Sequence, residues 1–172
     1  MKEKLRNKYL KIRKDITNRD IKDNIIYEKV INDQDIINSD LILVYVSYNN
    51  EVDTLKIINY FIDKKKIAVP RIDNNIMNFY YINSINDLKV GYYGILEPIN
   101  NNIVCEFNNS VCITPGICFD KYGYRIGYGK GFYDKFFYNH DVFKIGLCYN
   151  DCMVNRIVTD EYDIAVNKVI TD

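Results

Sequence analysis

The sequence predicts an α/β protein with a single open, mostly parallel sheet and helices on both faces, and two features support this prediction. Residues 41–46 (LILVYV) form a short, almost wholly apolar run, which is typical of a strand buried on both sides in a parallel sheet. Residues 54–62 then place apolar side chains at helical spacing, and residues 66–70 form a second apolar run. This strand–helix–strand order predicts a right-handed crossover.

Two helices are expected before the first strand. In residues 2–15 apolar side chains recur at helical spacing with cations on the other faces; they are Leu5, Tyr9, Ile12 and, just beyond, Ile16. Thr17 and Asp20 resemble a capping box, so a second helix is expected to start there and to continue through Val30. Asp53 or Thr54 can cap the helix of the crossover.

The rest of the chain supplies the outer parts of the sheet. We expect Pro70 to end the second strand, and we expect further strands at residues 77–82, 111–113, 143–148 and 169–170. A helix is expected over residues 131–137. The whole predicts a Rossmann-like three-layer sandwich, in which ligands bind beyond the carboxyl ends of the strands. The loop that follows residues 111–113 falls at such an end.

The composition indicates one globular domain spanning residues 1–172 and limits its partners. Lys+Arg and Asp+Glu are equal at 23 each, so the net charge of zero gives no general attraction to nucleic acid or anionic membranes. No apolar run approaches the roughly 20 residues of a membrane span, and no apolar stretch of a signal peptide follows the basic N-terminus. We expect a monomeric, cytoplasmic protein.

The cysteines and cations add two further expectations. Five cysteines without a CxxC pair and a single histidine, His140, argue against a zinc site. We expect the cysteines to act as small apolar residues in a reducing compartment. Lysine outnumbers arginine 17 to 6, so each arginine stands out against the default cation.

Five of the eight glycines fall within residues 114–134, and this stretch holds most of the functional information. Among the glycines, Gly116, Gly123, Gly127, Gly129 and Gly131, lie the charged residues Asp120, Arg125, Lys130 and Asp134. Such a cluster predicts backbone with φ > 0 or close approach of another molecule, and N–H groups beside cations suit phosphate. The alternative is a set of tight turns. Asp134 could pair with Lys130 or hold Mg²⁺ near the phosphates.

Three known motifs do not fit this stretch. A Walker loop fails because Lys130 is followed by Gly131 and lacks the preceding glycine spacing. The dinucleotide fingerprint fails because Phe132 stands where its last glycine belongs. An RNA-recognition strand is matched only superficially, because Asp134 stands where a base-stacking aromatic residue belongs and Lys135 breaks an apolar position.

Residues 115–134 (PGICFDKYGYRIGYGKGFYD) closely resemble the signature of the 5-formyltetrahydrofolate cyclo-ligases, also called methenyltetrahydrofolate synthetases. That signature runs P-G-x-x-F-D-x-x-G-x-R-[LI]-G-x-G-x-G-[YF]-Y-D. Further matches follow in order along nearly the whole chain: KEKLR at residues 2–6, EVDT at 51–54, Pro70 with Arg71, Glu97 with Pro98, and DIAV at 163–166. The length and order of these matches make the resemblance specific.

The resemblance implies an enzyme that uses ATP and Mg²⁺ to convert 5-formyltetrahydrofolate into 5,10-methenyltetrahydrofolate, releasing ADP and phosphate. In the implied mechanism the formyl oxygen attacks the γ-phosphorus, and N10 of the folate closes the ring on the phosphorylated imidate. This chemistry needs two positioned substrates and neutralised phosphate charge rather than a protein nucleophile. The implied partners are these two substrates, with no nucleic acid and no membrane.

The resemblance also implies roles for individual residues. ATP would be bound by Lys2, Arg6, Arg125, Ile126, Gly127, Tyr128, Gly129, Lys130, Gly131, Phe132 and Tyr133. Folate would be bound by Val46, Glu51, Tyr128, Gly129, Lys130, Gly131 and Phe132. Glu51 would face the donor-rich edge of the pterin, and catalysis would rely on Lys130, Arg125 and Tyr133. Mg²⁺ would be held by Asp134 and Asp163. For Asp134, the resemblance therefore favours binding of the metal over an ion pair with Lys130.

Four departures from the family pattern bear on these roles. Tyr128 stands where the family often has arginine, so one phosphate-facing cation is missing. Phe132 replaces a common tyrosine, and near Asp163 the residues Val158 and Asn167 replace a usual proline and aspartate. Two alternatives stay open: a non-catalytic folate- or nucleotide-binding protein, and an RNA-binding module.

Overall fold

A six-stranded sheet forms the centre of the computed structural model, which describes the backbone of residues 1–172 and every side chain except that of Tyr92. Its strands lie in the order β11 (Lys168–Ile170), β9 (Phe143–Leu147), β6 (Ser110–Thr114), β1 (Leu41–Val44), β2 (Lys66–Asp73) and β3 (Ile76–Ile82). The first five are parallel to one another, and β3 is antiparallel to β2. The predicted α/β class with a mostly parallel sheet is confirmed.

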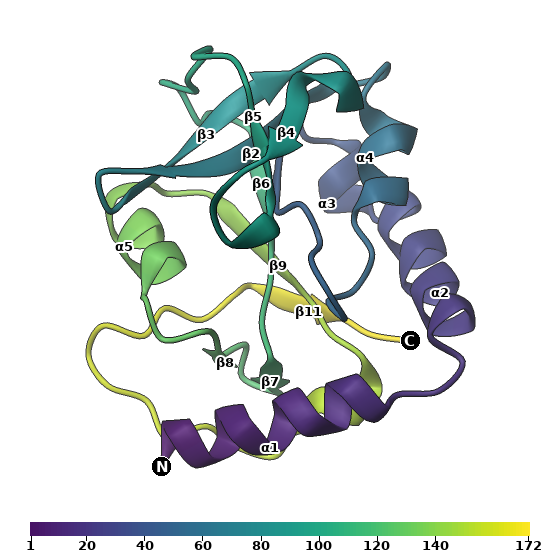
Figure 1. Ribbon diagram of the computed structural model, residues 1–172, viewed down its shortest axis with the longest axis vertical. Coiled ribbons are helices and arrows are strands. Elements are labelled where there is room, and N and C mark those ends of the chain that lie inside the picture. The colour runs from purple at the N-terminus through teal and green to yellow at the C-terminus, as the bar shows by residue number, and fades with distance from the viewer.

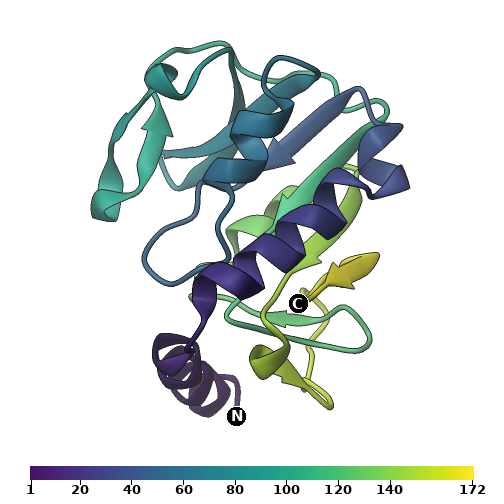
Figure 2. The ribbon, with the colours of Figure 1, turned by 90° about the vertical axis from the view of Figure 1, so that its right-hand side faces the viewer.

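Helices cover both faces of this sheet (Figures 1 and 2). The helices are α1 (Lys2–Asp15), α2 (Arg19–Ile31), α3 (Gln34–Ile37), α4 (Leu55–Phe61) and α5 (Phe132–Asn139), with short 3₁₀ turns at Ile85–Asp87, Tyr92–Gly94 and Asn150–Cys152. Within β1, Ile42 packs in the core cluster formed with α2, α3 and α4, whereas Leu43 packs in the cluster formed with α5. Because successive side chains point to opposite faces, a strand covered on both sides must be apolar throughout.

Two smaller sheets were not predicted from the sequence. One contains β10 (Met153–Val154), β7 (Cys118–Asp120) and β8 (Arg125–Ile126), and the other pairs β4 (Leu88–Val90) with β5 (Leu96–Pro98). α1 lies against the first of them (Figure 1), where Leu5, Tyr9 and Ile12 pack on a cluster that includes Phe119 and Ile126. The apolar stripe predicted for residues 2–15 is confirmed, and its partner is this small sheet.

The strand order locates a switch point. Along the chain the parallel strands come in the order β1, β2, β6, β9 and β11, yet in the sheet β2 lies on one side of β1 and β6 on the other. The direction in which strands are added therefore reverses between β1 and β6. In open α/β sheets, ligands bind in the crevice at the carboxyl ends of the strands at such a point.

The second strand does not end at Pro70 as expected, because β2 continues to Asp73. β1 pairs with β2 only as far as Ala68, so Pro70 lies beyond the stretch where an N–H is needed toward β1. β2 then turns into β3 through Asn74 and Asn75, whose φ values are 50° and 65°. Asparagine tolerates this left-handed backbone, which hairpin turns of this kind require.

Of two helix starts with a predicted cap, that of α2 differs from the expectation and that of α4 agrees with it. The capping box predicted at Thr17 is wrong, because the N-cap of α2 is Asn18, which has a left-handed backbone (φ 53°) and makes no capping hydrogen bond. α4 begins after Thr54, but the cap is the carboxylate of Asp53, which accepts from the first N–H of the helix (2.9 Å). Thr54 instead donates to the carbonyl of Tyr45 (2.6 Å), which fixes the segment after β1.

Gly123→Ala is expected to destabilise the fold by about 2 kcal/mol or more, because it adds backbone strain and a collision. The φ of Gly123 is +87°, and a Cβ there would lie 2.3 Å from the carbonyl oxygen of Val166. The matched control is Gly127→Ala, where a Cβ would meet nothing within 4 Å. The control should stay within about 0.5 kcal/mol of the wild type in urea unfolding. Equal losses in both variants would contradict the prediction.

Candidate functional site

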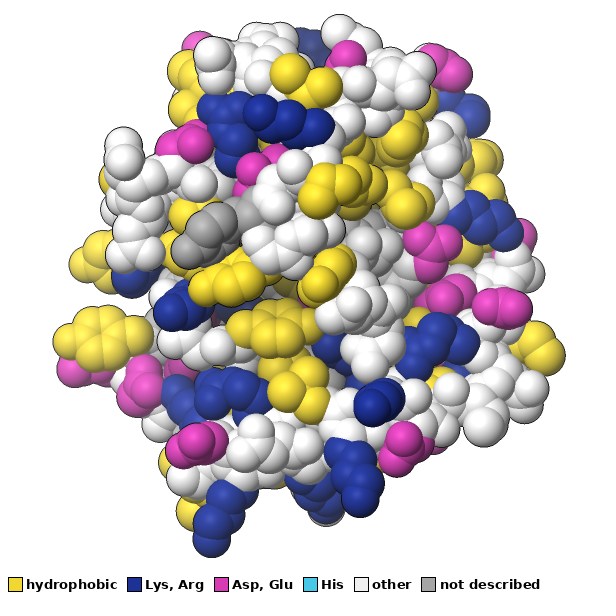
Figure 3. All heavy atoms as spheres, in the orientation of Figure 1, with side chains coloured by type: hydrophobic (Ala, Val, Ile, Leu, Met, Phe, Trp, Pro, Cys, Tyr) yellow, Lys and Arg dark blue, Asp and Glu magenta, His cyan; other side chains and the backbone are white. Residues whose placement is uncertain are grey.

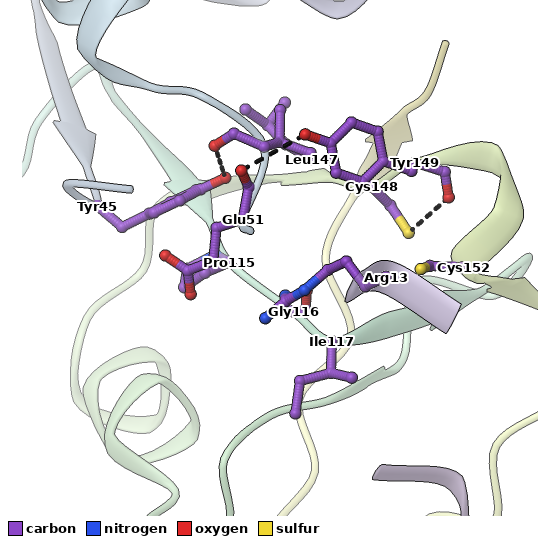
Figure 4. Close-up of a pocket in the computed structure, with 11 residues that line it drawn as sticks. Arg13, Tyr45, Glu51, Pro115, Gly116, Ile117, Leu147, Cys148, Tyr149 and Cys152 are labelled. Carbon is purple, nitrogen blue, oxygen red and sulfur yellow. Dashed lines mark hydrogen bonds between the residues drawn. The ribbon is translucent and has the colours of Figure 1, made fainter. Parts of the chain in front are cut away.

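A narrow pocket lies at the switch point, beyond the carboxyl ends of β1, β6 and β9 (Figure 4). Its walls include Tyr45 and Glu51 after β1, Gly116 after β6 and Tyr149 after β9, and Arg13 enters from α1. The free volume is about 10 Å³, which is close to what a single water molecule needs. The pocket is therefore where the strand order predicts a ligand site, but a fused ring enters it only if a wall moves.

Arg13 is a buried cation in this pocket, with 3% of its surface exposed. Its Nε donates to Asn50 (3.1 Å), its Nη1 to the carbonyl of Gly116 (3.2 Å) and its Nη2 to the hydroxyl of Tyr128 (2.7 Å). None of the ion pairs formed by the described residues includes it. Arg13 was not predicted from the sequence; the one signal for it was the scarcity of arginine beside lysine.

Glu51 presents its carboxylate to the same pocket. Its Oε2 accepts from the N–H of Tyr48 (2.9 Å), and its Oε1 accepts from the hydroxyl of Tyr128 (3.3 Å). Figure 4 shows the guanidinium of Arg13 reaching from α1 toward this carboxylate. Burial raises the pKa of Glu51, although the Tyr48 N–H and the charge of Arg13 act in the opposite direction. The pocket thus holds an acceptor and a cationic donor side by side.

The hydroxyl of Tyr128 joins these two groups. It accepts from Arg13 and donates to Glu51, while 54% of the Tyr128 surface is exposed. Burial of the hydroxyl end raises the pKa of Tyr128, and the negative charge of Glu51 raises it further. The hydroxyl therefore keeps its proton and can act as both donor and acceptor. Through it the glycine-rich loop contacts the carboxylate that the sequence predicts for folate.

Tyr149 and α2 support the pocket from behind. The Tyr149 side chain is 1% exposed, and its hydroxyl donates to Asp23 (2.5 Å). Arg19 donates to the carbonyl of Asn50 (2.5 Å) and lies 5.2 Å from the centre of the Tyr149 ring. Burial raises the pKa of both Tyr149 and Asp23. These contacts fix α2 to the segment that bears Glu51, and none of them was predicted.

The glycine-rich loop has the backbone that the sequence predicts. The φ values of Gly129 and Gly131 are +90° and +67°, and α5 begins at the next residue. The N–H groups of residues 127–131 donate to no acceptor in the hydrogen bonds of the described residues. Arg6 donates to the carbonyl of Gly127 (2.8 Å), and Figure 3 shows lysine and arginine side chains gathered over α1 nearby. Unpaired N–H groups at a helix start suit an anion.

The two cations of this loop differ in their surroundings. Lys130 is exposed and forms no ion pair with any side chain that the structure describes. The Arg125 side chain is 6% exposed, and it donates to Asp134 (2.8 Å) and to the carbonyl of Ile164 (2.7 Å). Asp134 therefore pairs with Arg125 rather than with Lys130. The catalytic roles of Arg125 and Lys130 stay predictions.

Asp134 and Asp163 lie in adjoining segments, because the N–H of Ile164 donates to Asp134 (3.1 Å). Asp163 accepts from Lys2 (2.5 Å). The described residues contain no group of three or more possible ligands that could hold a metal. Each carboxylate nevertheless keeps one oxygen without a hydrogen bond among these residues. Mg²⁺ commonly takes one or two carboxylates and completes its shell with phosphates and water, so the pair fits a metal bound with nucleotide.

The remaining predicted site residues belong to the packing around the pocket. Val46 and Ile126 are 4% and 2% exposed and lie in core clusters. Phe132 and Tyr133, at the start of α5, are half-buried against the clusters on the sheet. Burial raises the pKa of Tyr133 well above its usual value, so its hydroxyl stays protonated. Its catalytic role and the binding roles of the other three stay predictions.

The cysteines and the histidine have structural surroundings. Cys112, Cys118, Cys148 and Cys152 are buried, as an apolar role requires, and burial raises the pKa of the first two to about 12. Cys105 is exposed, contrary to that expectation. His140 lies 4.5 Å from each of the rings of Phe107 and Phe136. Of the helices described, none combines the length and the apolarity that crossing a membrane would require.

A model of the "5-formyltetrahydrofolate cyclo-ligase family" matches residues 1–172. The chain belongs to this family. It is 28% identical over 139 residues to the 5-formyltetrahydrofolate cyclo-ligase of Escherichia coli K12, covering 76% of each chain. It is 27% identical over 138 residues to the protein of the same name from Haemophilus influenzae, covering 75% of this chain and 74% of the other.

A solved structure leads to the same family. The fold matches that of the Aquifex aeolicus 5,10-methenyltetrahydrofolate synthetase with a TM-score of 0.89 and 27% identity. The match covers 99% of this chain and 89% of that one. The cyclo-ligase fold is therefore shared over nearly the full length, including the glycine-rich loop and α1.

Arg125→Met is expected to cost about 1–3 kcal/mol of stability, because it leaves Asp134 without its cation and the Ile164 carbonyl without its donor. Lys130→Met is the matched control, since it removes the same charge from the same loop at an exposed position. The control should change stability by less than about 0.5 kcal/mol. Urea unfolding of the two variants measures the difference, and a larger loss for Lys130→Met would reverse the assignment.

Proposed function

We propose that this protein converts 5-formyltetrahydrofolate into 5,10-methenyltetrahydrofolate, with ATP cleaved to ADP and phosphate. The supporting observation is the contact between Tyr128 of the glycine-rich loop and Glu51 of the pocket (3.3 Å). It places a loop suited to phosphate beside a carboxylate suited to the N–H groups of a pterin. Two substrates bound at these places would meet with their reacting ends at the loop, and such proximity supplies much of the catalysis.

The proposed reaction has two balanced steps. The formyl oxygen attacks the γ-phosphorus of ATP, ADP leaves, and the formyl group on N5 becomes a phosphorylated imidate. N10 then attacks the formyl carbon, phosphate leaves with the carbon–oxygen electron pair, and N10 loses its proton as the ring closes. No protein atom forms a covalent bond, so the protein has to orient the substrates and neutralise charge.

The triphosphate would lie along residues 127–131. Their N–H groups, which have no acceptor within the described residues, would bind phosphate oxygens together with Lys130. Arg6 lies beside this loop, where its Nη2 is 3.2 Å from the position that a Cβ on Gly129 would take. Mg²⁺ held by Asp134 and Asp163 would supply further neutralisation of the phosphates. Lys2 donates to Asp163, so its ammonium group would lie beside the metal site and add positive charge there.

The turnover assay tests this proposal directly. The protein, 5-formyltetrahydrofolate, ATP and Mg²⁺ should together yield the absorbance of the methenyl product and an equal amount of phosphate. Lys130→Met should raise the KM for ATP at least about tenfold, because one charge-assisted hydrogen bond is lost. Lys135→Met is the control: this exposed lysine lies within α5, and its variant should keep the wild-type KM.

One result would contradict the proposed activity, and another would contradict only the role of Lys130. Calorimetric binding of folate and ATP by the folded protein, without product, would establish a non-catalytic binding protein. Wild-type kcat and KM in Lys130→Met would remove that lysine from the site while leaving the activity in place.

Folate binding is expected to weaken as the pH falls through the pKa of Glu51. The pterin N–H groups need an ionised acceptor, and burial raises the pKa of Glu51 above its usual value of 4.5, so protonation starts at a higher pH than for an exposed glutamate. Below that pKa the dissociation constant should rise about tenfold per pH unit. Calorimetry at a series of pH values measures this, and Glu51→Gln should bind weakly with a flat profile. An unchanged slope in Glu51→Gln would assign the titration to another group.

A further inference from the structure

Arg13 is a buried charge without a countercharge in contact, and this is costly. Its three hydrogen bonds go to neutral oxygens of Asn50, Gly116 and Tyr128, and the carboxylate of Glu51 is reached through the Tyr128 hydroxyl. Burying a guanidinium without an ion pair loses several kcal/mol of hydration, in order of magnitude. A neutral side chain could hold the backbone at lower cost. The guanidinium therefore has a role beyond packing, and its position in the lining of the pocket indicates that this role is ligand binding.

The Tyr128 hydroxyl fills a polar position between two groups of opposite kind. On one side it accepts a hydrogen bond from Arg13 (2.7 Å), and on the other it donates one to Glu51 (3.3 Å). The pyrimidinone edge of a pterin offers the same pair of functions on neighbouring atoms, a carbonyl that accepts and ring and amino N–H groups that donate. The hydroxyl thus occupies the place that this edge would take.

The surroundings of Tyr128 allow it to leave. More than half of its surface is exposed, and it stands between Gly127 and Gly129 in a loop whose N–H groups are unpaired in the described structure. The pocket lined by its two partners, Arg13 and Glu51, has a free volume of about 10 Å³. A pterin has several times the volume of the single water that such a space admits. Entry of the ring therefore requires a neighbouring group to move, and Tyr128 is an exposed side chain whose hydroxyl holds the lining residues Arg13 and Glu51.

We propose that Arg13 and Glu51 together bind the pterin edge, with Arg13 donating to the carbonyl and Glu51 accepting the N–H groups, and that Tyr128 is a plug that holds this pair until folate displaces it. The inference deepens the proposed function and rests on it. Arg13 becomes a folate-binding residue, and its charge selects a carbonyl at that position of the ring. The plug keeps the buried guanidinium hydrogen-bonded in the free protein.

The selection by Arg13 is tested with two ligands in calorimetry: 5-formyltetrahydrofolate and the analogue that has an amino group in place of the pterin carbonyl. The wild type should prefer the carbonyl compound, since an amine opposite Arg13 leaves two donors facing each other. Arg13→Gln should lose affinity for the carbonyl compound by at least about tenfold and bind the amino analogue within about twofold of the wild type. Equal losses for both ligands would mean that Arg13 only supports the fold, and would overturn the assignment.

The plug is tested with Tyr128→Phe, which keeps the ring and removes both hydrogen bonds. Folate should then bind faster and with a lower dissociation constant, by about threefold or more, because no bonds to Tyr128 are broken on entry. Weaker or unchanged binding would overturn the plug. This variant also covers the case in which Arg13→Gln fails to fold. If the wild type turns over substrate but both variants miss these outcomes, the inference about Arg13 and Tyr128 is refuted and the proposed function stands. If the wild type binds no folate, the proposed function is refuted together with the inference.

Discussion

The site depends on one buried guanidinium. α1 packs on the small sheet and not on the central one, so it needs a separate link to the switch point. Arg13 provides that link by donating to Asn50 after β1, to Gly116 after β6 and to Tyr128 in the glycine-rich loop. Three segments distant in sequence are thereby held around one planar fork, whose fixed geometry lysine lacks. Together with the direct bond from Tyr128 to Glu51, Arg13 fixes the loop relative to the segment that bears Glu51.

The same device recurs along the chain. Five of the six arginines donate to a backbone carbonyl: Arg6 to Gly127, Arg13 to Gly116, Arg19 to Asn50, Arg71 to Pro98 and Asn100, and Arg125 to Ile164. Lysines, at 17, mostly lie at the surface, and several form ion pairs there. Lysine is the usual cation of this chain. Arginine occurs where the planar guanidinium donates several hydrogen bonds at once, including bonds to backbone carbonyls that need a partner. In a chain so rich in lysine, the position of an arginine therefore indicates a structural role.

The sequence predicts those features that depend on near neighbours. The apolar stripe of α1 and the burial of β1 on both faces follow from local sequence alone, and both are confirmed. Pro70 could not be placed, because its tolerance depends on where β1 stops pairing. The partner of Asp134 in α5 is not Lys130, four residues away, but Arg125 in β8 on the other side of the glycine-rich loop. The role of Arg13 could not be predicted for the same reason, since its hydrogen-bond partners lie 37, 103 and 115 residues further along the chain.

Tyr128 shows how a departure from a family pattern can suit the residues around it. An arginine at this position would set a second guanidinium beside Arg13 in a poorly solvated place, where like charges repel strongly. Tyrosine supplies a neutral hydroxyl that accepts from Arg13 and still donates to Glu51. Arg13 does not replace the phosphate-facing cation that the loop lacks, because its three hydrogen bonds go to Asn50, Gly116 and Tyr128. Residues 13 and 128 are thus best understood as a pair, in which the identity of one constrains the charge of the other.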